Sequence, residues 1–236
     1  MNKRVLIVLS IVIFSGCGGD SDVNTDTAPD TTTSLKQLDG LYANTNDLLL
    51  MIVDSKRKEV AIMLGNYRDG DIFLFDSHSL VDNTVTTKGL KHFSGSNSLF
   101  HHDPELETTI RFDEKTASIS GIIEDQNFLY SFIRLRSLEW SLAVGTHTGL
   151  NGTVWDIKKD GSFIINGACI VTGKMVNRDF YFAAENIQAA NCGDNKLNGD
   201  DYQGWFVISE LQGDIFLSGA MYNQKGILSD YIHVTP

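Results

Sequence analysis

Short runs of β-branched and aromatic residues, separated by Gly, Asn and Asp, dominate the chain from residue 38 onward. Such runs are typical of antiparallel strands and hairpins, and no stretch has a convincing 3.6-residue helical period. The pattern predicts strands at 48–54, 59–64, 71–75, 108–112, 117–124, 128–135, 152–157, 162–166, 169–176, 180–185, 202–209, 214–222 and 227–234. The sequence therefore predicts an all-β protein with antiparallel strands.

Three predicted turns contain a glycine at a position that is expected to need a positive φ, namely Gly70, Gly161 and Gly213. Pro104 is the only proline between residue 35 and the terminal Pro236, so the predicted strands keep their ladder N–H groups. These features favour a series of hairpins.

A faint internal repeat relates the two halves of the chain. Residues 110–121 and 208–219 share a strand, turn, strand and Ser-Gly layout about 98 positions apart, and a last predicted strand follows each. Residues 38–42 and 149–155 each open a half with Gly and an aromatic residue. The repeat predicts two similar β units of about 100 residues each.

We place the first β unit at 36–136, a connector at 137–148 and the second β unit at 149–236. Meanders of about six to eight strands can form two small sandwiches or barrels, or two halves of one large barrel. Trp140 lies in the connector, where it either packs the units together or is an exposed contact residue.

The first seventeen residues have the pattern of an export signal. Lys3 and Arg4 precede an apolar run at 5–14 that is about ten residues long, shorter than the roughly 20 residues of a spanning helix. The sequence Phe-Ser-Gly-Cys at 14–17 resembles the lipobox of bacterial lipoproteins, with Phe14 where Leu is usual. The resemblance implies a signal peptide at 1–16 and a lipidated Cys17.

A lipidated cysteine implies anchoring to a bacterial membrane. Gly18 follows Cys17, whereas Asp at that place is the familiar inner-membrane retention signal, so the resemblance favours the outer membrane. Residues 17–35 contain almost no apolar side chains after the cysteine, which predicts a disordered acidic tether. A flexible coil of about 18 residues would hold the folded part on the order of 20 to 25 Å from the lipid surface.

Composition argues against one class of partner and predicts one disulfide bond. The 236-residue chain has a formal net charge of −11, which argues against nucleic-acid binding because that affinity comes from clustered Lys and Arg. With Cys17 reserved for lipid, Cys169 and Cys192 are an even pair in an exported protein, and we expect them to form a structural disulfide.

Candidate metal sites are few. Asp194, Asp200 and Asp201 supply oxygen ligands around Gly199 for a calcium ion, although the spacing is not that of an EF-hand and a solvated hairpin loop is the simpler interpretation. Residues 101–103, His-His-Asp, carry transition-metal ligands, but a surface loop before Pro104 explains them as well. No nucleotide-binding, zinc-protease or serine-hydrolase motif occurs in the sequence, and we expect no cofactor.

Trp155 and Trp205 are the remaining candidates for ligand binding, either lining a groove for an apolar or sugar ligand or filling a core. The Gly-x-aromatic opening at 40–42, in a lipid-anchored context, resembles bacterial lipocalin-type lipoproteins. The sequence thus favours a non-enzymatic, lipid-anchored envelope protein that binds a ligand or a partner protein. A lipocalin-like carrier of an apolar molecule and a hydrolase of envelope polymers are the alternatives.

Overall fold

The computed structural model describes residues 33–57, 60–94, 99–123, 126–149, 152–211 and 213–234. The predicted signal peptide, Cys17 and the predicted tether up to residue 32 lie outside the described residues. All of the elements below belong to one compact unit, Thr32–Pro236.

The described residues are almost entirely strands. The elements are α1 (Leu35–Leu38), β1 (Gly40–Asn44), β2 (Leu49–Val53), β3 (Ile62–Asn66), β4 (Asp71–Val81), β5 (Thr84–Ser94), β6 (Leu99–Phe112), β7 (Thr116–Ile123), β8 (Gln126–Leu135), η1 (Trp140–Ala143), β9 (Gly145–Thr148), β10 (Val154–Ile157), β11 (Ser162–Asn166), β12 (Ile170–Asn177), β13 (Phe182–Ala190), η2 (Asn195–Leu197), β14 (Gly199–Leu211), β15 (Asp214–Tyr222) and β16 (Ile227–His233). Among these residues, no helix has the length and apolar content needed to cross a membrane.

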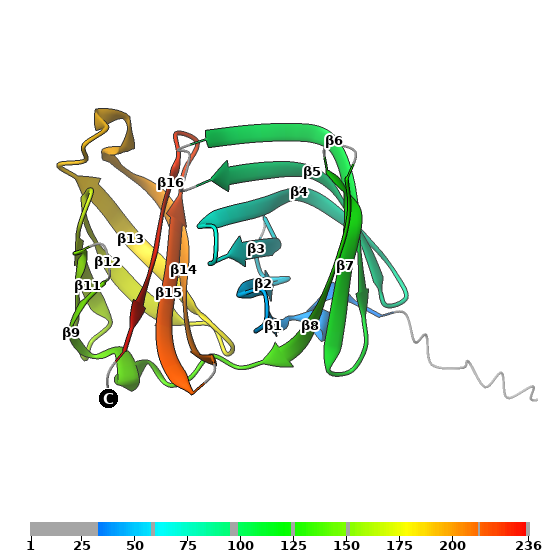
Figure 1. Ribbon diagram of the computed structural model, residues 1–236, viewed down its shortest axis with the longest axis horizontal. Coiled ribbons are helices and arrows are strands. Elements are labelled where there is room, and N and C mark those ends of the chain that lie inside the picture. The colour runs from blue at the N-terminus through cyan, green and yellow to red at the C-terminus, as the bar shows by residue number, and fades with distance from the viewer. Residues whose placement is uncertain are drawn as a thin grey trace, which may run out of the picture. The chain divides into compact units, whose positions relative to one another are not determined.

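Two antiparallel meanders account for the strands (Figure 1). β1 to β8 pair in sequence order, and β1 also pairs with β8, which closes a barrel. β9 to β16 form a second eight-stranded, barrel-like sheet in sequence order, with β9 and β16 as its edges. The prediction of an all-β protein with two similar units is confirmed, and one unit is a closed barrel while the other is an open sheet.

The predicted repeat corresponds to equivalent strands of the two sheets. Ile110 on β6 pairs with Ile119 on β7, and Ile208 on β14 pairs with Leu217 on β15. These are the sixth and seventh strands of each sheet, and all four side chains are buried. The repeat in the sequence therefore records a repeated hairpin in the structure.

The opening motifs of the two halves do not correspond in the same way. β9 occupies residues 145–148, which the sequence placed in the connector, so Trp155 lies on the second strand of its sheet whereas Tyr42 lies on the first of its own. Trp140, in η1, packs against the core of the second sheet. At the other end of the connector, Ser137 donates a backbone hydrogen bond to the carbonyl oxygen of Phe180.

The sequence pattern missed β1, β5 and the outer parts of β4 and β6. Val85 and Leu90 both face the barrel core, although a regular alternation places positions 85 and 90 on opposite faces. Gly89, between them, has a φ of +78°, and a Cβ there would lie 2.5 Å from the Asp76 carboxylate. The irregular backbone at Gly89 shifts the inward-facing positions, so the alternation on which the prediction depends is broken. The predicted turn glycines Gly70, Gly161 and Gly213 do have positive φ.

Three cores hold the fold together. The barrel interior is filled by side chains that include Tyr42, Met51, Phe75 and Phe132. The second sheet has its own core around Trp155, Phe163 and Phe206. A third core joins the outer face of the barrel to the second sheet, with Leu41, Ala43, Leu50, Ile52, Val60, Met63, Ile72, Leu74 and Phe93 from the barrel and Tyr181, Ala183, Trp205, Val207, Ala220 and Tyr222 from the sheet.

Candidate functional site

The predicted disulfide is present. Cys169 immediately precedes β12 and Cys192 follows β13, and their sulfur atoms lie 2.07 Å apart. Both residues are buried in the core of the second sheet. The bond therefore links the two strands where the Ile170–Ala190 pair ends their ladder.

Trp155 and Trp205 occupy two different cores rather than one ligand groove. Trp155 is 1% exposed, and its ring packs edge-on against Phe206 at 5.8 Å between centroids. Trp205 is 2% exposed and lies in the core between the barrel and the second sheet, against Tyr222 at 5.9 Å. Both tryptophans thus fill cores, which was the second of the two roles that the sequence suggested.

The acidic residues considered for calcium do not converge. Asp194 accepts a hydrogen bond from the backbone N–H of Lys196 and caps η2, while Asp201 accepts one from the Asn223 side chain at 2.9 Å. Among the described residues, which include Asp200, no group of three metal-ligating side chains forms. We therefore do not propose the calcium site.

His102 belongs to β6 and not to a loop, and its partner is the Asp76 carboxylate of β4, which reaches it across β5. Its Nε2 lies 2.6 Å from one Asp76 oxygen, and Lys91 Nζ lies 2.6 Å from the other. Burial raises the pKa of Asp76, but the hydrogen bonds from Lys91 and His102 outweigh burial and lower it overall. The Asp76 carboxylate is therefore already paired with both side chains at the protein surface.

One end of the barrel brings together Asp71, His92 and Ser94. His92 Nε2 lies 3.5 Å from Asp71 Oδ2, and its ring stacks on Phe73 at 4.6 Å. Ser94 is 5% exposed and pairs across the ladder with Asp71. A buried hydroxyl beside the carboxylate does not present an accessible nucleophile to a substrate, so this group does not have the layout of a hydrolase triad.

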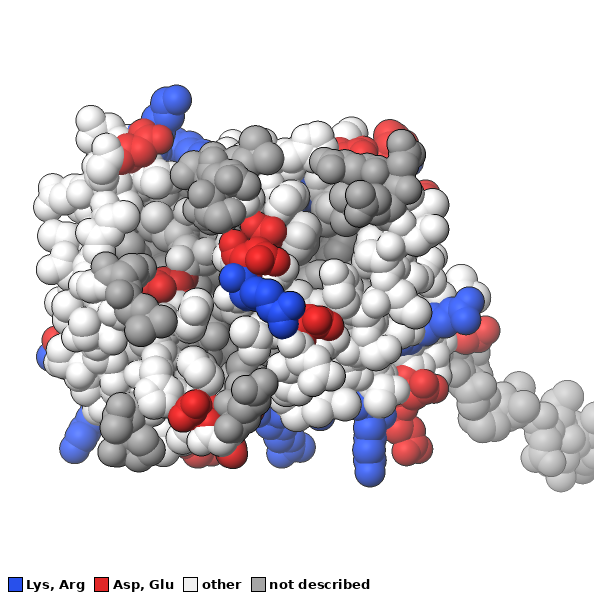
Figure 2. All heavy atoms as spheres, in the orientation of Figure 1, with Lys and Arg blue, Asp and Glu red and all other residues white. Residues whose placement is uncertain are grey.

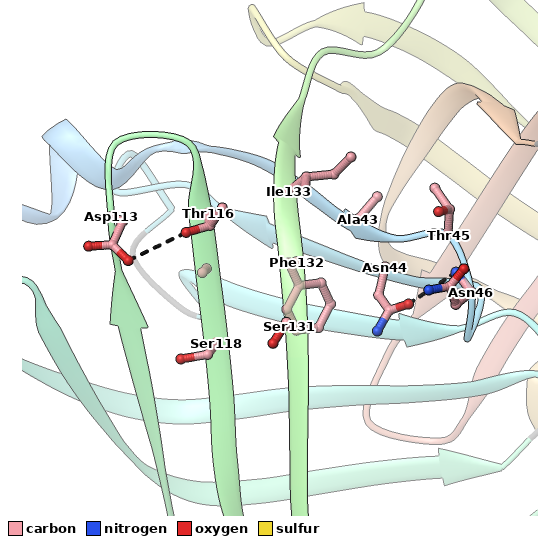
Figure 3. Close-up of a pocket in the computed structure, with 11 residues that line it drawn as sticks. Ala43, Asn44, Thr45, Asn46, Asp113, Thr116, Ser118, Ser131, Phe132 and Ile133 are labelled. Atoms are coloured by element: carbon pink, nitrogen blue, oxygen red, sulfur yellow. Dashed lines mark hydrogen bonds between the residues drawn. The ribbon is translucent and has the colours of Figure 1, made fainter.

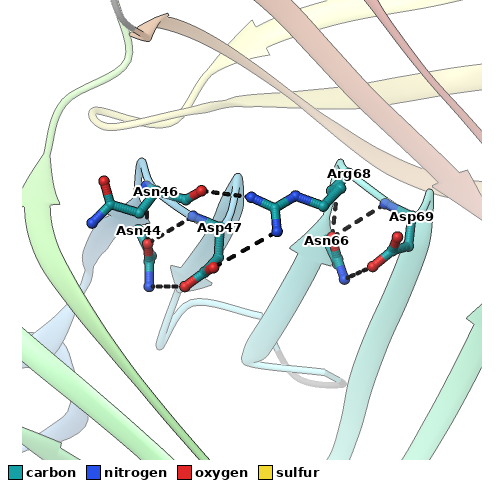
Figure 4. Close-up of polar contacts among 6 residues, drawn as sticks. All are labelled: Asn44, Asn46, Asp47, Asn66, Arg68 and Asp69. Atoms are coloured by element: carbon teal, nitrogen blue, oxygen red, sulfur yellow. Dashed lines mark hydrogen bonds and ion pairs between the residues drawn. The ribbon is translucent and has the colours of Figure 1, made fainter.

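Two neighbouring turns at the same end of the barrel have the same hydrogen-bond pattern (Figure 4). The Asn44 side chain accepts hydrogen bonds from the N–H groups of residues 46 and 47 and donates to the Asp47 carboxylate, and Asn66 does the same with residues 68 and 69. Arg68 then donates to the carbonyl oxygen of Asn46 at 2.6 Å. The β1–β2 and β3–β4 turns are therefore fastened internally and to each other.

A shallow recess, which we call the seam recess, lies where the pairing of β1 with β8 ends (Figure 3). β1 and β8 pair only from Leu41–Leu135 to Ala43–Ile133, and a recess of about 430 Å³ opens beyond the last pair. Asn44, Asp113 and Ser131 are among the polar groups that line it. Ile133 is 50% exposed beside it, so the recess has one apolar border.

A larger recess, of about 920 Å³, lies where β8 leaves the barrel; we call it the cationic cleft. It is lined by Asp39, Gly40, Lys115, Arg134, Leu135, Arg136, Asp179 and Phe180. On the face that Figure 2 shows, acidic and basic side chains are interspersed in a mostly uncharged surface. Three cations in one recess are therefore a distinct feature of a chain whose formal charge is −11.

A buried polar network crosses the contact between the two sheets. Tyr181, from the second sheet, donates a 2.6 Å hydrogen bond to Asp54 Oδ2, and these residues are 1% and 3% exposed. Arg57 Nη2 donates to the Tyr222 hydroxyl at 2.9 Å and to Gln203 at 3.1 Å. Burial and the hydrogen bond to Asp54 raise the pKa of Tyr181 to about 12, with Arg57 opposing the shift.

No family model, curated protein or solved structure matches this chain.

The cationic cleft was not predicted from the sequence, although a signal for it exists. Arg134 and Arg136 flank Leu135 at the end of a strand, and alternation along a strand directs positions 134 and 136 to the same side. Lys115 joins them only through pairing, because its carbonyl oxygen accepts a 2.7 Å hydrogen bond from the Arg134 N–H. Two like charges at a spacing of two residues are thus the part of this site that a sequence can reveal.

Proposed function

We propose that this protein is a lipid-anchored, non-enzymatic binding module of the bacterial cell envelope, held at the outer membrane through Cys17. The support for its location is the leader at 1–16, the cysteine that follows it and the acidic segment up to residue 35. The support for its activity comes from the folded part.

The proposal that this protein binds its ligand or partner at the outer surface rests on the packed interior of the barrel. A lipocalin-like carrier needs an internal cavity for its ligand, whereas Tyr42, Met51 and Phe132 are all at most 1% exposed inside this barrel. The cationic cleft and the seam recess open outward. We therefore favour recognition by external clefts and loops over transport inside the barrel.

Replacing Cys17 with Ala tests the anchor. The variant is expected to lose lipid labelling and to leave the outer-membrane fraction, because it lacks the thiol that accepts the lipid. A Gly18→Asp variant is the matched control: it should stay lipidated but move to the inner-membrane fraction. Unchanged lipid labelling and outer-membrane fractionation of Cys17→Ala would show that the proposed anchor is wrong.

Native mass spectrometry of the protein extracted from its own envelope in mild detergent tests the binding activity. We expect a bound small molecule or a bound protein in addition to the mass of the acylated chain. A small molecule would direct attention to the cationic cleft, and a protein to the loops and the seam recess. Recovery of the acylated chain alone, under conditions that preserve a known weak complex, would contradict the proposed activity.

A further inference from the structure

The cationic cleft has more positive charge than its own carboxylates neutralise. None of Lys115, Arg134 and Arg136 forms an ion pair with a carboxylate of the described residues. The two carboxylates that line the cleft are already engaged, since Asp39 accepts hydrogen bonds from Ser55 N and Oγ at 2.6 and 2.8 Å, and Asp179 pairs with Lys56 at 3.4 Å. The cleft therefore attracts anions.

Arg134 is held in position before any ligand arrives. Its guanidinium lies over the Tyr42 ring, 5.8 Å from the centroid, and donates a hydrogen bond to the carbonyl oxygen of Asp39. Gly40 leaves the necessary space, because a Cβ there would lie 2.9 Å from Arg134 Nε. An arginine fixed in this way loses less conformational entropy when it binds an anion.

The same cleft has an apolar wall. Leu135 and Phe180 line it and are only partly buried, and the Phe180 ring packs on Tyr181 at 5.2 Å. Phe180 comes from the β12–β13 turn of the second sheet, whereas the three cations come from the barrel. A ligand that fills the cleft would contact charged groups on one side and apolar groups on the other.

We propose that the cationic cleft binds a phosphate monoester attached to a small apolar group, with Lys115, Arg134 and Arg136 around the phosphate and Leu135 and Phe180 against the apolar part. A phosphate monoester carries about −1.5 to −2 charges at pH 7 and offers three acceptor oxygens, which suits a cleft lined by three cations better than a carboxylate does. The inference rests on the proposed binding function and names its ligand class.

The test uses the purified full chain carrying Cys17→Ala, so that its outcome does not depend on the anchor. Hexyl phosphate, below its micelle concentration, is titrated by calorimetry and by amide chemical shifts, with inorganic phosphate and hexanol as comparison probes. We expect saturable binding of hexyl phosphate with shifts at residues 115, 134–136 and 179–180. Inorganic phosphate should bind at least about tenfold more weakly, because it lacks the apolar contact.

Two variants and one control separate the site from general electrostatics. Arg136→Gln should weaken hexyl phosphate binding about tenfold through loss of a charge-assisted contact. Gly40→Ala changes no charge but displaces Arg134, and it should weaken binding similarly. Lys159→Gln, at an exposed turn, alters the net charge as Arg136→Gln does and should leave the affinity unchanged.

Three results would overturn the proposal. They are equal weakening by Lys159→Gln and Arg136→Gln, shifts confined to residues outside the cleft, and inorganic phosphate binding as tightly as hexyl phosphate, which would indicate an adventitious ion only. Vesicles that contain phosphatidic acid distinguish the source of the ligand: competition with hexyl phosphate assigns the phosphate to a lipid headgroup, and no competition assigns it to a soluble ester. Failure of the fractionation test with intact hexyl phosphate binding would refute the anchor but not the cleft.

Discussion

Replacement of Asp54 with Ala is expected to lower the free energy of unfolding by about 2–4 kcal/mol, because it removes two hydrogen bonds and leaves a buried hydroxyl without its acceptor. Asp54 is 3% exposed and accepts hydrogen bonds from the Tyr181 hydroxyl and from the Lys56 N–H. Without the carboxylate, the Tyr181 hydroxyl loses its acceptor, and Arg57 remains beside it as a partly buried cation. Urea unfolding monitored by circular dichroism measures the loss.

Because of the same network, we expect the free energy of unfolding to fall at alkaline pH. The pKa of Tyr181 is raised from 10.0 to about 12 in the folded protein, so folding favours the protonated phenol. Its contribution is complete below pH 10 and is lost between pH 10 and 12, as the pH rises through the folded pKa; two pKa units correspond to roughly 3 kcal/mol. Over that window, Tyr181→Phe should show a smaller loss of stability than the unmodified chain.

Tyr231→Phe is the matched control for this experiment. Tyr231 is 40% exposed and lies outside the core that joins the two sheets, so loss of its hydroxyl should leave the free energy of unfolding unchanged. If Asp54→Ala and Tyr231→Phe unfold at the same urea concentration, the network does not contribute to the contact between the sheets. Parallel pH profiles for Tyr181→Phe and the unmodified chain would refute the assigned titration.

The strand pattern predicted the fold class because each sheet pairs its strands in sequence order. Residues 162–166 and 214–222 were predicted with the bounds that the structure shows for β11 and β15. The prediction failed where the local rule is broken, as at Gly89, or where a strand is short, as at β9, whose four residues follow η1 directly. Such strands depend on their pairing partners, and a single sequence does not show partners.

The contact between the two units can be recognised in the sequence from uninterrupted apolar runs, which the search for alternating positions does not detect. Residues 205–208, Trp-Phe-Val-Ile, are buried without interruption, with Trp205 and Val207 facing the barrel and Phe206 and Ile208 facing the core of their own sheet. Residues 49–53 on β2 are buried on both faces in the same way. Wholly apolar runs indicate strands covered on both sides, so these two runs mark the contact between the units. The cationic cleft left a weaker signal, because Lys115 and Phe180 come from turns that are far from Arg134 and Arg136 in the sequence.

Removal of the disulfide is the second large effect that we expect. The Cys169–Cys192 bond closes a loop with a sequence separation of 23, and the chain-entropy model assigns about 3 kcal/mol of stabilisation to a loop of this size. A Cys169→Ala, Cys192→Ala double variant should therefore unfold at lower guanidinium concentration. Both cysteines are also buried in the core of the second sheet, so their replacement removes apolar contacts as well.

The positions of the three tryptophans make it possible to test whether the loss of stability in the double variant extends to the barrel. Trp155 packs in the core of the second sheet with Trp140 against it, and Trp205 packs in the core that joins this sheet to the barrel. Tryptophan fluorescence therefore reports on the second sheet and this contact, whereas far-UV circular dichroism reports on both sheets. Because the third core joins the barrel to the second sheet, we expect the two signals to shift together in the double variant. A shift in fluorescence alone would show that the barrel unfolds independently of the second sheet. If reduction adds no mass of two protons to the mature chain and leaves its unfolding midpoint unchanged, the bond does not form in solution.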